Sequence, residues 1–543
     1  MVVGEFDVHD AERTVFDVIV IGTGMGGGVL GHRLAASGRR VLFVEKGRST
    51  LPGAPDTIRA AVPESAEPQA ARSVAAYRDA LARAGRSTDE VEDISGRFPK
   101  RFTPFIGSGT GGSSALYGMV CERFFAQDFT PRQNFADPGD STVPEAWPVS
   151  YEELAPWYAQ AERLLGVRGQ PDPLRPEAAA VGLPAAPPFS PDNQPLVDYL
   201  TDRGLHPYHL PMACDYTAGC VTCQTYLCDR GCKNDAARNC VLPAVTEYGA
   251  HLLTDCRALH LAADRRRVNE VICAHQGRSL TLRARVVVLA AGALATPLLL
   301  LASRSGQWPR GLANSSDLVG RNLMRHLLDP VEIWPQPDSA ITDANKEIGL
   351  NDFYFHQGQK YGTVQSFGAI PPMEWLVNRP GAQGRALRLM TPVVRRVYER
   401  FFTGGLVLAA MMEDLPYLDN RVLPPDPAGG RPHARIHYRL HANEIERHGA
   451  FMRLFHELLS PFRSRSLGSG RNNANLGHVC GTCRFGTDPA TSVLDAHNRA
   501  HELDNLYVVD TSFFPSSAGL NPSLTVAANA LRVAGHIDQA HFA

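Results

Sequence analysis

The segment 16–47 constrains the fold more than any other part of the chain. It reads FDVIVIGTGMGGGVLGHRLAASGRRVLFVEKG: an apolar run, a glycine-rich turn, a helical stretch and a second apolar run. Gly22, Gly24 and Gly27 stand in GxGxxG register, and Glu45 closes the second run. This order predicts a βαβ unit that binds a dinucleotide, with backbone amides against the pyrophosphate and the acidic side chain on a ribose hydroxyl. A glycine-rich turn alone would explain the glycines but not the strands and the acid around them.

Length and composition set the broad class of protein. A chain of 543 residues exceeds what one hydrophobic core supports, so two or more lobes are expected. A formal net charge of -2 gives no electrostatic reason to expect a nucleic acid partner. The longest apolar run, 286–302, is interrupted by Thr296 and Pro297 and predicts a buried strand and helix, not a membrane span. Because the N-terminus is acidic, unlike an export signal, the 11 cysteines are expected as thiols or ligands in the cytoplasm.

Three further segments indicate how the chain continues. Residues 107–114 are almost entirely glycine and serine, which lets a backbone pack directly against a flat or charged ligand. Ser150 is placed to cap an amphipathic helix. Residues 283–303 again predict strand, turn and helix, and a C-terminal strand is expected to end at Asp510. Between 330 and 465, alternating segments such as GGLVLAAMMED and ARIHYRLH predict an antiparallel sheet in a separate lobe.

Two cysteine motifs need separate explanations. In NLGHVCGTCRFGTDP, His478 precedes Cys480 and Cys483, so the motif is a metal site, a redox dithiol or a histidine that acts on a bound ligand. The stretch 214–240 holds six cysteines, four of them in CxxCxxxxCxxxC spacing. That density suits zinc or an iron-sulfur cluster, and free thiols or a disulfide are the alternatives. The candidate metal ligands are Cys220, Cys223, Cys228 and Cys232.

These motifs, taken in order, are similar to those of GMC (glucose-methanol-choline) flavin oxidoreductases. The similar motifs are the GxGxxG turn with Glu45, GTGGSSALYGM, WPVSYEELAPWY, VVLAAGALATPLLLL, LVGRNL, HVCGTCRFG and VVDTSFFPSSAGLNPSLTVAANALRVA. They cover nearly the whole chain outside 330–465 and most resemble bacterial sugar, polyol and aminoglycoside dehydrogenases. The resemblance implies an α/β fold, with a Rossmann-like FAD-binding domain and an interleaved α+β substrate domain containing a largely antiparallel sheet.

The resemblance also implies a division of the chain. The FAD-binding domain is expected to comprise 1–169, 236–329 and 466–543, and the last part carries the catalytic residues. A cysteine-rich connection over the FAD cleft is expected at 170–235 and the substrate domain at 330–465. Some relatives carry an iron-sulfur cluster on a similar cysteine-rich stretch.

FAD is the cofactor that the resemblance implies. Some family members attach it covalently through a histidine in the glycine-rich loop, and this chain has none there, so non-covalent FAD is expected. The residues expected to contact FAD are Gly22, Gly24, Met25, Gly27, Glu45, Lys46, Gly111, Gly112, Ser113, Tyr117, Gly118, Met119, Ala258, Ala291, Gly292, Asp510, Asn521, Pro522 and Leu524.

The family pattern makes His478 the catalytic base and Asn521 its partner. Histidine accepts a proton near neutral pH, which suits removal of a hydroxyl proton while hydride leaves the same alcohol. A hydrogen-bonded core histidine is the alternative for His478, and an N-cap followed by Pro522 is the alternative for Asn521. In this interpretation Cys480 and Cys483 form no metal or dithiol site, and Cys483 is a small buried side chain.

The expected reaction is oxidation of a CH–OH group of a polar, sugar-like or glycosylated small molecule, with oxygen or an external electron acceptor. Oxidation of a sterol or long-chain alcohol is one alternative, and a flavin-retaining lyase without net redox chemistry is another. Aromatic residues of the substrate domain are the candidates for an apolar pocket or for core packing: Phe353, Tyr354, Phe355, Trp375 and Phe401.

Overall fold

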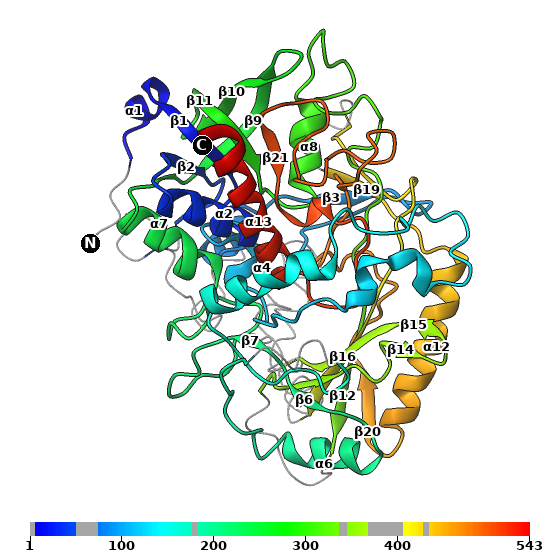
Figure 1. Cartoon of the computed structure of the whole chain (residues 1–543). Coiled ribbons are helices and arrows are strands. Elements are labelled where there is room, and N and C mark those ends of the chain that lie inside the picture. Colours follow the sequence, from blue (N-terminus) through cyan, green and yellow to red (C-terminus); the bar gives the residue numbers. More distant parts are fainter. Residues whose placement is uncertain are drawn as a thin grey trace.

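The computed structural model describes residues 6–49, 51, 74–175, 182–335, 345–367, 405–426 and 434–543. Two sheets dominate it, a mixed sheet in the upper half of Figure 1 and a six-stranded antiparallel sheet in the lower half. Helices α1 (Val8–Arg13) and α13 (Ser523–Phe542), from the first and last parts of the described chain, both lie in the upper half, so the chain leaves the first layer, builds the second and returns.

The mixed sheet has seven strands in the order β8-β2-β1-β11-β10-β9, with β21 also paired to β11. β1, β2, β8 and β21 run parallel to their neighbours, and β9, β10 and β11 form an antiparallel meander. The strands are β1 (Val15–Ile21), β2 (Val41–Val44), β8 (His251–Leu253), β9 (Cys256–Ala263), β10 (Val268–His275), β11 (Arg278–Leu289) and β21 (Leu506–Val508). The βαβ unit predicted from 16–47 is therefore confirmed.

Helices α2 (Met25–Ala36) and α13 (Ser523–Phe542) pack against each other beside this sheet, and α4 (Tyr151–Leu164) packs on α13. Ser150 caps α4 as predicted: its side chain accepts the Glu153 N–H at 3.2 Å, and the Glu153 carboxylate accepts the Ser150 N–H at 2.7 Å. The other helices are α1 (Val8–Arg13), α3 (Val74–Arg83), α6 (Gln194–Asp202), α7 (Leu242–Thr246) and α8 (Ala295–Ala302).

The antiparallel sheet expected in the substrate lobe runs β20-β12-β17-β16-β13-β6. Its strands are β6 (Tyr208–His209), β12 (Leu327–Trp334), β13 (Ile348–Leu350), β16 (Gly362–Ser366), β17 (Leu406–Met412) and β20 (Arg463–Ser466). Helix α12 (Ala442–Leu459), which the sequence analysis did not anticipate, buries Phe451, Phe455 and Leu458 against one face of this sheet.

A smaller sheet runs β18-β19-β3-β4. Its strands are β18 (Arg421–Leu423), β19 (Ala434–His437), β3 (Val91–Asp93) and β4 (Lys100–Phe102). The segment ARIHYRLH supplies β19, as a strand was predicted there, and β19 pairs antiparallel with β18 and parallel with β3. The predicted sheet was wrong, since β19 lies in this smaller sheet, because alternation reports a half-buried strand and not its partners. Two short pairs complete the described strands: β5 (Val167–Arg168) with β7 (Met212–Ala213), and β14 (Phe355–His356) with β15 (Gln359–Lys360).

The aromatic residues proposed for an apolar pocket do not form one in the part that the structure describes. Phe353 belongs to the core under α12, Tyr354 stacks on Phe125 with ring centroids 4.1 Å apart, and Phe355 is 39% exposed. Trp375 and Phe401 lie outside the described residues. Phe353 and Tyr354 are therefore core residues of separate clusters, and Phe355 is exposed.

A fully buried ion triad connects the end of β17 to the short helical turn 126–129. The Lys360 amino group lies 2.6 Å from the Asp128 carboxylate and also contacts the Glu413 carboxylate, and all three side chains are inaccessible. Asp128 further accepts the Tyr354 hydroxyl at 2.8 Å. Since Glu413 follows β17 and Asp128 precedes α4, the triad fixes the antiparallel sheet to the segment before α4.

Replacing the lysine of this triad should be costly. Lys360→Met leaves two carboxylates buried without their cation, which is expected to lower the free energy of unfolding by about 3–5 kcal/mol. Chemical denaturation of the purified protein measures it. Arg266→Ala is the matched control, because Arg266 forms an exposed pair with Asp504 at 2.9 Å that contributes at most about 1 kcal/mol. Equal effects of the two substitutions would contradict the assigned role.

Candidate active site

The glycine-rich turn forms an open cradle at the N-terminus of α2. Gly22 has a φ of +99°, and a Cβ there would lie 2.4 Å from the Ala290 carbonyl oxygen, so β1 and the 290–292 turn need glycine to approach. A Cβ on Gly27 would lie 2.1 Å from the Gly22 carbonyl oxygen. At Gly24, the N-cap of α2, a Cβ would meet nothing within 4 Å. The first two glycines therefore pack the unit, and the space at Gly24 fits a pyrophosphate held by the helix amides.

The Glu45 carboxylate joins this turn to the glycine/serine loop. One oxygen accepts the Thr23 hydroxyl at 2.7 Å and the Thr23 N–H at 3.2 Å, and the other accepts the Gly47 N–H at 3.0 Å and the Gly109 N–H at 3.2 Å. Lys46, predicted beside FAD, forms an ion pair with Asp89 at 2.8 Å. Glu45 therefore organises the cradle through four protein donors, and ribose binding by this residue stays a prediction.

The glycine/serine loop lies directly against the turn, as expected. The Gly111 N–H donates to the Thr23 hydroxyl at 3.2 Å, and a Cβ on Gly112 would lie 3.1 Å from the Gly24 Cα. Met119 is buried in the left-handed region with a φ of +61°. Among the other predicted residues, the Ser113 hydroxyl accepts the Gly107 N–H and the Tyr117 hydroxyl donates to the Asn234 carbonyl.

Asp510 connects the C-terminal part to the same end of the sheet. Its buried carboxylate accepts the Gly292 N–H at 3.0 Å and the Thr296 hydroxyl at 2.6 Å, and burial raises its pKa. Ala291 is exposed next to Gly292. The remaining predicted FAD residues lie in or beside regular elements: Met25 in α2, Ala258 in β9, Pro522 at the start of α13 and Leu524 within it.

The predicted base, His478, is paired with a second histidine that the sequence analysis missed. Nδ1 of His478 lies 3.1 Å from Nδ1 of His326, and Nε2 of His326 lies 3.1 Å from the Ser517 carbonyl oxygen. A carbonyl cannot donate, so Nε2 of His326 carries its proton and Nδ1 accepts. The proton between the rings then belongs to Nδ1 of His478, which leaves Nε2 of His478 unprotonated and able to act as a base.

The surroundings of His478 keep it neutral. The pKa of His478 is lowered from the usual 6.5 to about 3. The largest cause is burial of the ring, and the charges of His326 and Lys346 are the next two. A negative charge brought into the site would act in the opposite direction and raise its pKa. His478 is thus a free base over the whole physiological range, and its affinity for a proton depends on what is bound beside it.

Asn521 is not the N-cap of α13, contrary to that reading of the sequence. The helix begins at Ser523 with Pro522 as its N-cap, and the Asn521 side chain makes no capping hydrogen bond. The reason is that the first intrahelical hydrogen bond runs from the Val526 N–H to the Pro522 carbonyl oxygen, at 3.0 Å, which makes Pro522 the N-cap. Oδ1 of Asn521 is buried without a hydrogen-bond partner in the part that the structure describes. An unused buried amide at this place is available to a ligand.

An acidic pair after β17 holds the catalytic segments in place. The Asp414 carboxylate accepts the N–H groups of Arg325 and His326 at 2.8 and 3.0 Å and the Ser517 hydroxyl at 3.2 Å. The Glu413 carboxylate accepts the Ala518 N–H at 3.0 Å. His326 has a φ of +62°, a conformation that these hydrogen bonds fix.

Cys480 and Cys483 are buried in the main hydrophobic core, 1% and 0% exposed, and hold the His478 loop by backbone hydrogen bonds. The Cys480 N–H donates to the Met324 carbonyl at 2.9 Å and the Cys483 N–H to the Ser512 carbonyl at 2.8 Å. This packing argues against a metal site or a redox dithiol at this motif, because both thiols pack as small apolar side chains around the loop that carries His478.

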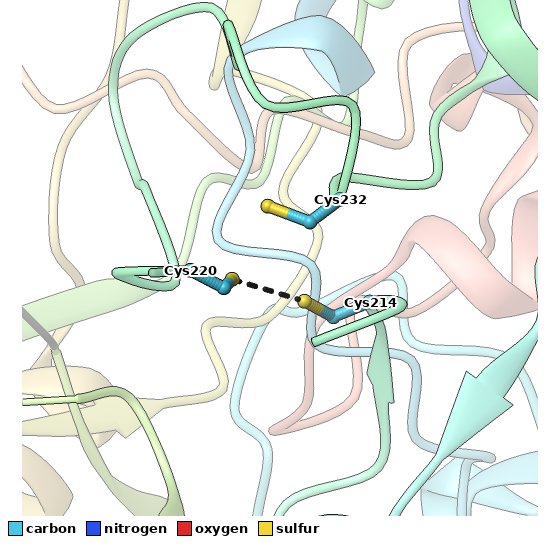
Figure 2. A group of neighbouring side chains, drawn as sticks. All are labelled: Cys214, Cys220 and Cys232. Carbon is cyan, nitrogen blue, oxygen red and sulfur yellow. Dashed lines mark hydrogen bonds between the residues drawn. The ribbon is translucent and has the colours of Figure 1, made fainter. Parts of the chain in front are cut away.

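The second cysteine stretch gathers its thiols into one place, and Cys214 joins them. Figure 2 shows Cys214, Cys220 and Cys232 pointing toward one another, with all three Sγ atoms within 4.8 Å. The Sγ atoms of Cys214 and Cys220 are 3.6 Å apart, and those of Cys228 and Cys232 are 3.4 Å apart. A hydrogen bond from Cys223 lowers the pKa of Cys228. We call Cys214, Cys220, Cys223, Cys228 and Cys232 the thiol group.

Comparisons with known proteins place these features in a family. The N-terminal profile of GMC oxidoreductases matches residues 16–328, and the C-terminal profile of GMC oxidoreductases matches residues 421–530. Paromamine 6'-oxidase of Streptomyces fradiae is 32% identical over 99% of this chain and 94% of its own length. The 6'''-hydroxyparomomycin C oxidase of Streptomyces lividus is 32% identical over 96% and 92%. A formate oxidase variant of Aspergillus oryzae RIB40, solved to follow FAD modification, shares 15% identity with a TM-score of 0.64 over 97% and 99% of the chains.

The chain therefore belongs to the GMC oxidoreductase family and is an FAD-dependent enzyme that acts on alcohols. This bears out the expected family, fold class and reaction class. None of the helices in the described ranges combines the length and the apolar character needed to cross a membrane.

The histidine pair makes a prediction for pH dependence. Protonation inactivates a base, so with the pKa of His478 lowered to about 3, the acid limb of flavin reduction should lie far below pH 6.5. His326→Asn tolerates the positive φ but cannot reach His478, and it removes one cause of the lowered pKa. The acid limb should then move to higher pH, and the rate should fall by roughly three- to tenfold for one lost hydrogen bond.

The profile is measured by stopped-flow reduction at a series of pH values. His206→Asn is the control, because His206 is an exposed histidine bound to Asp352. An unchanged acid limb of the pH profile in His326→Asn would show that His326 does not affect the protonation of His478.

Proposed function

We propose that this enzyme oxidises a primary or secondary alcohol group of an amino sugar or similar glycosylated molecule to a carbonyl. The observation that carries the proposal is the contact of His478 with His326, from which we infer an unprotonated Nε2 of His478, in a chain whose family oxidises alcohols. Two relatives that are 32% identical over almost the full chain are named for oxidation of paromamine and of a hydroxyparomomycin. Their shared substrate chemistry supports a polyhydroxylated amino sugar over a sterol or long-chain alcohol.

The residues divide the work as follows. Bound FAD supplies the hydride acceptor. His478 takes the hydroxyl proton at Nε2, and His326 orients the ring through the Nδ1 contact. Oδ1 of Asn521 is buried without a protein partner in the described ranges, and it can accept a hydrogen bond from a substrate group beside the reacting carbon. Because α13 begins two residues later, its free N–H groups favour the negative charge that develops nearby.

Several finer assignments belong to the same proposal. FAD is bound non-covalently, since the loop 111–119 offers no histidine, and oxygen is the acceptor, since both relatives are named oxidases. The enzyme is cytoplasmic, with its cysteines as thiols or metal ligands, and takes no nucleic acid partner. The five-segment division of the chain also stands as a proposal. A lyase reaction remains the alternative outcome of the experiment below.

Removing the base tests this function. His478→Ala should slow reduction of the flavin by paromamine by roughly 10²- to 10⁴-fold, because positioned proton transfer is lost, while the spectrum of bound FAD is kept. Anaerobic bleaching of the flavin absorbance after rapid mixing measures it. His497→Ala, an exposed histidine, is the matched control.

Two results would contradict the proposal. Unchanged reduction in His478→Ala would remove this residue from the mechanism. A wild-type enzyme that turns over an alcohol adduct without any flavin bleaching would favour the lyase.

We further propose that four of the five cysteines of the thiol group, Cys214 among them, bind a single tetrahedral metal ion such as zinc. With Zn–S bonds of about 2.3 Å, neighbouring sulfurs in a tetrahedral site are about 3.8 Å apart. The spacings of 3.6 Å and 3.4 Å are near that value. In a [4Fe–4S] cluster each thiolate binds a different iron and the sulfurs lie further apart, so these spacings favour one ion over a cluster of that type.

Metal analysis of protein purified without chelators tests the thiol group. About one zinc per chain and no acid-labile sulfide are expected, with the metal lost in Cys220→Ser. Cys240→Ala is the control, since Cys240 lies in the same stretch but is buried in the main core. Iron with labile sulfide would establish a cluster instead, and a metal-free chain would establish free thiols.

A further inference from the structure

One buried lysine is unused by the mechanism described so far. Lys346 is 2% exposed and precedes β13, the strand of the substrate sheet next to β6. Its backbone N–H donates to the Thr222 hydroxyl at 3.1 Å. Thr222 lies in the thiol-group stretch, between Cys220 and Cys223, so the loop that the thiols gather also positions this lysine.

The amino group of Lys346 lies against the glycine/serine loop. Nζ donates to Oε1 of Gln224 at 3.1 Å. A Cβ on Gly118 would lie 2.7 Å from Nζ and 2.6 Å from that Gln224 oxygen, so the lysine reaches the loop because residue 118 is glycine. The ring of Phe367 lies 5.2 Å from Nζ on another side. The lysine is therefore held beside Gly118, one of the residues that the family resemblance predicts to contact FAD.

The charge of Lys346 also reaches the catalytic base. It is one of the causes, after burial and His326, that lower the pKa of His478. Contacts with Gln224 and Gly118 fix the amino group of Lys346. Its effect on the pKa of His478 agrees with a position near the base, where a substrate must sit for its hydroxyl to meet that base.

Lys346 differs from the other buried lysines in what it contacts. Lys360 contacts two carboxylates, and Lys233 donates to the carbonyls of Ala115 and Tyr226. Within the described ranges, Lys346 has no ion pair, and its one side-chain hydrogen bond, to Gln224, leaves two N–H directions unused. A buried amino group is rarely left in this state unless a ligand completes it.

We propose that Lys346 is a further active-site residue that donates a hydrogen bond to an oxygen of the sugar substrate beside His478. This inference rests on the proposed function and adds a substrate contact to it. Burial lowers the pKa of Lys346 to about 7, and the Glu122 carboxylate acts in the opposite direction by raising it. A lysine that loses its charge near neutral pH tolerates a cationic amino sugar better than a fully charged one would.

The decisive experiment compares Lys346→Met with the wild type in anaerobic flavin reduction, using paromamine and its single-deoxy analogues. Loss of one hydrogen bond from the Lys346 amino group should lower kcat/KM for paromamine by about three- to tenfold, chiefly through KM. One deoxy analogue should lose about the same factor in the wild type and almost nothing further in Lys346→Met, which identifies the contacted oxygen. Lys100→Met, an exposed lysine of β4, is the control.

A second readout separates this role from a structural one. Lys346→Met should keep the melting temperature and the spectrum of bound FAD, while the acid limb of the pH profile moves upward because a cation near His478 is gone. The other charged or titratable groups that act on this region are His326, which affects the pKa of His478, and Glu122, which affects the pKa of Lys346. Gln224→Leu, which releases Nζ from its tether, should raise KM in the same direction by a smaller factor.

Failure is distinguishable from failure of the proposed function. If paromamine does not bleach the wild-type flavin, the amino-sugar assignment falls, and the same comparison is made with whichever sugar or polyol does bleach it. Unchanged kcat/KM in Lys346→Met, or equal losses for every deoxy analogue in both enzymes, would overturn the inference. A shifted flavin potential with an unchanged KM would assign the lysine to the flavin and also overturn it.

Discussion

The acidic pair Glu413 and Asp414 is the contact on which the candidate active site depends. These two residues follow β17, and their carboxylates accept hydrogen bonds from the segment before β12 and from the loop before α13. One segment carries His326 and the other leads to Asn521. Glu413 also contacts Lys360, whose other partner, Asp128, lies in the segment before α4. The same few buried charges therefore tie the antiparallel sheet to that segment and hold the two segments that carry His326 and lead to Asn521.

This arrangement explains how a common side chain becomes a usable base. Ser517 fixes the proton of His326 at Nε2, His326 fixes the proton of His478 at Nδ1, and Nε2 of His478 is left free. Burial and two neighbouring cationic or protonatable side chains keep that ring neutral. Hydrogen bonding sets which nitrogen accepts the proton, and electrostatics set when it does so. The loop stabilised by the thiol group adds Lys346 to the same space through Thr222 and Gln224.

The parts of the fold that were predictable are those set by local rules. Gly22 and Gly27 are recognisable because only glycine fits those close approaches, and the capping box at Ser150 lies within four residues. His326 was missed because its role arises from a contact with a ring 152 positions away and from a positive φ imposed by Asp414. Cys214 was missed because a bridge to Lys233, rather than sequence spacing, brings it to the other thiols. The N-cap interpretation of Asn521 failed because the carbonyl of Pro522 accepts the first intrahelical hydrogen bond, from Val526.

The central claim is that His478 presents an unprotonated Nε2 to the alcohol. Neutron diffraction from deuterated crystals of the FAD-bound enzyme near pH 7 tests it most directly, because deuterium positions on the two rings are then observed. The account predicts deuterium on Nδ1 of His478 and on Nε2 of His326, with Nε2 of His478 bare and facing the isoalloxazine. Deuterium on Nε2 of His478, or that nitrogen directed away from the flavin, would contradict it.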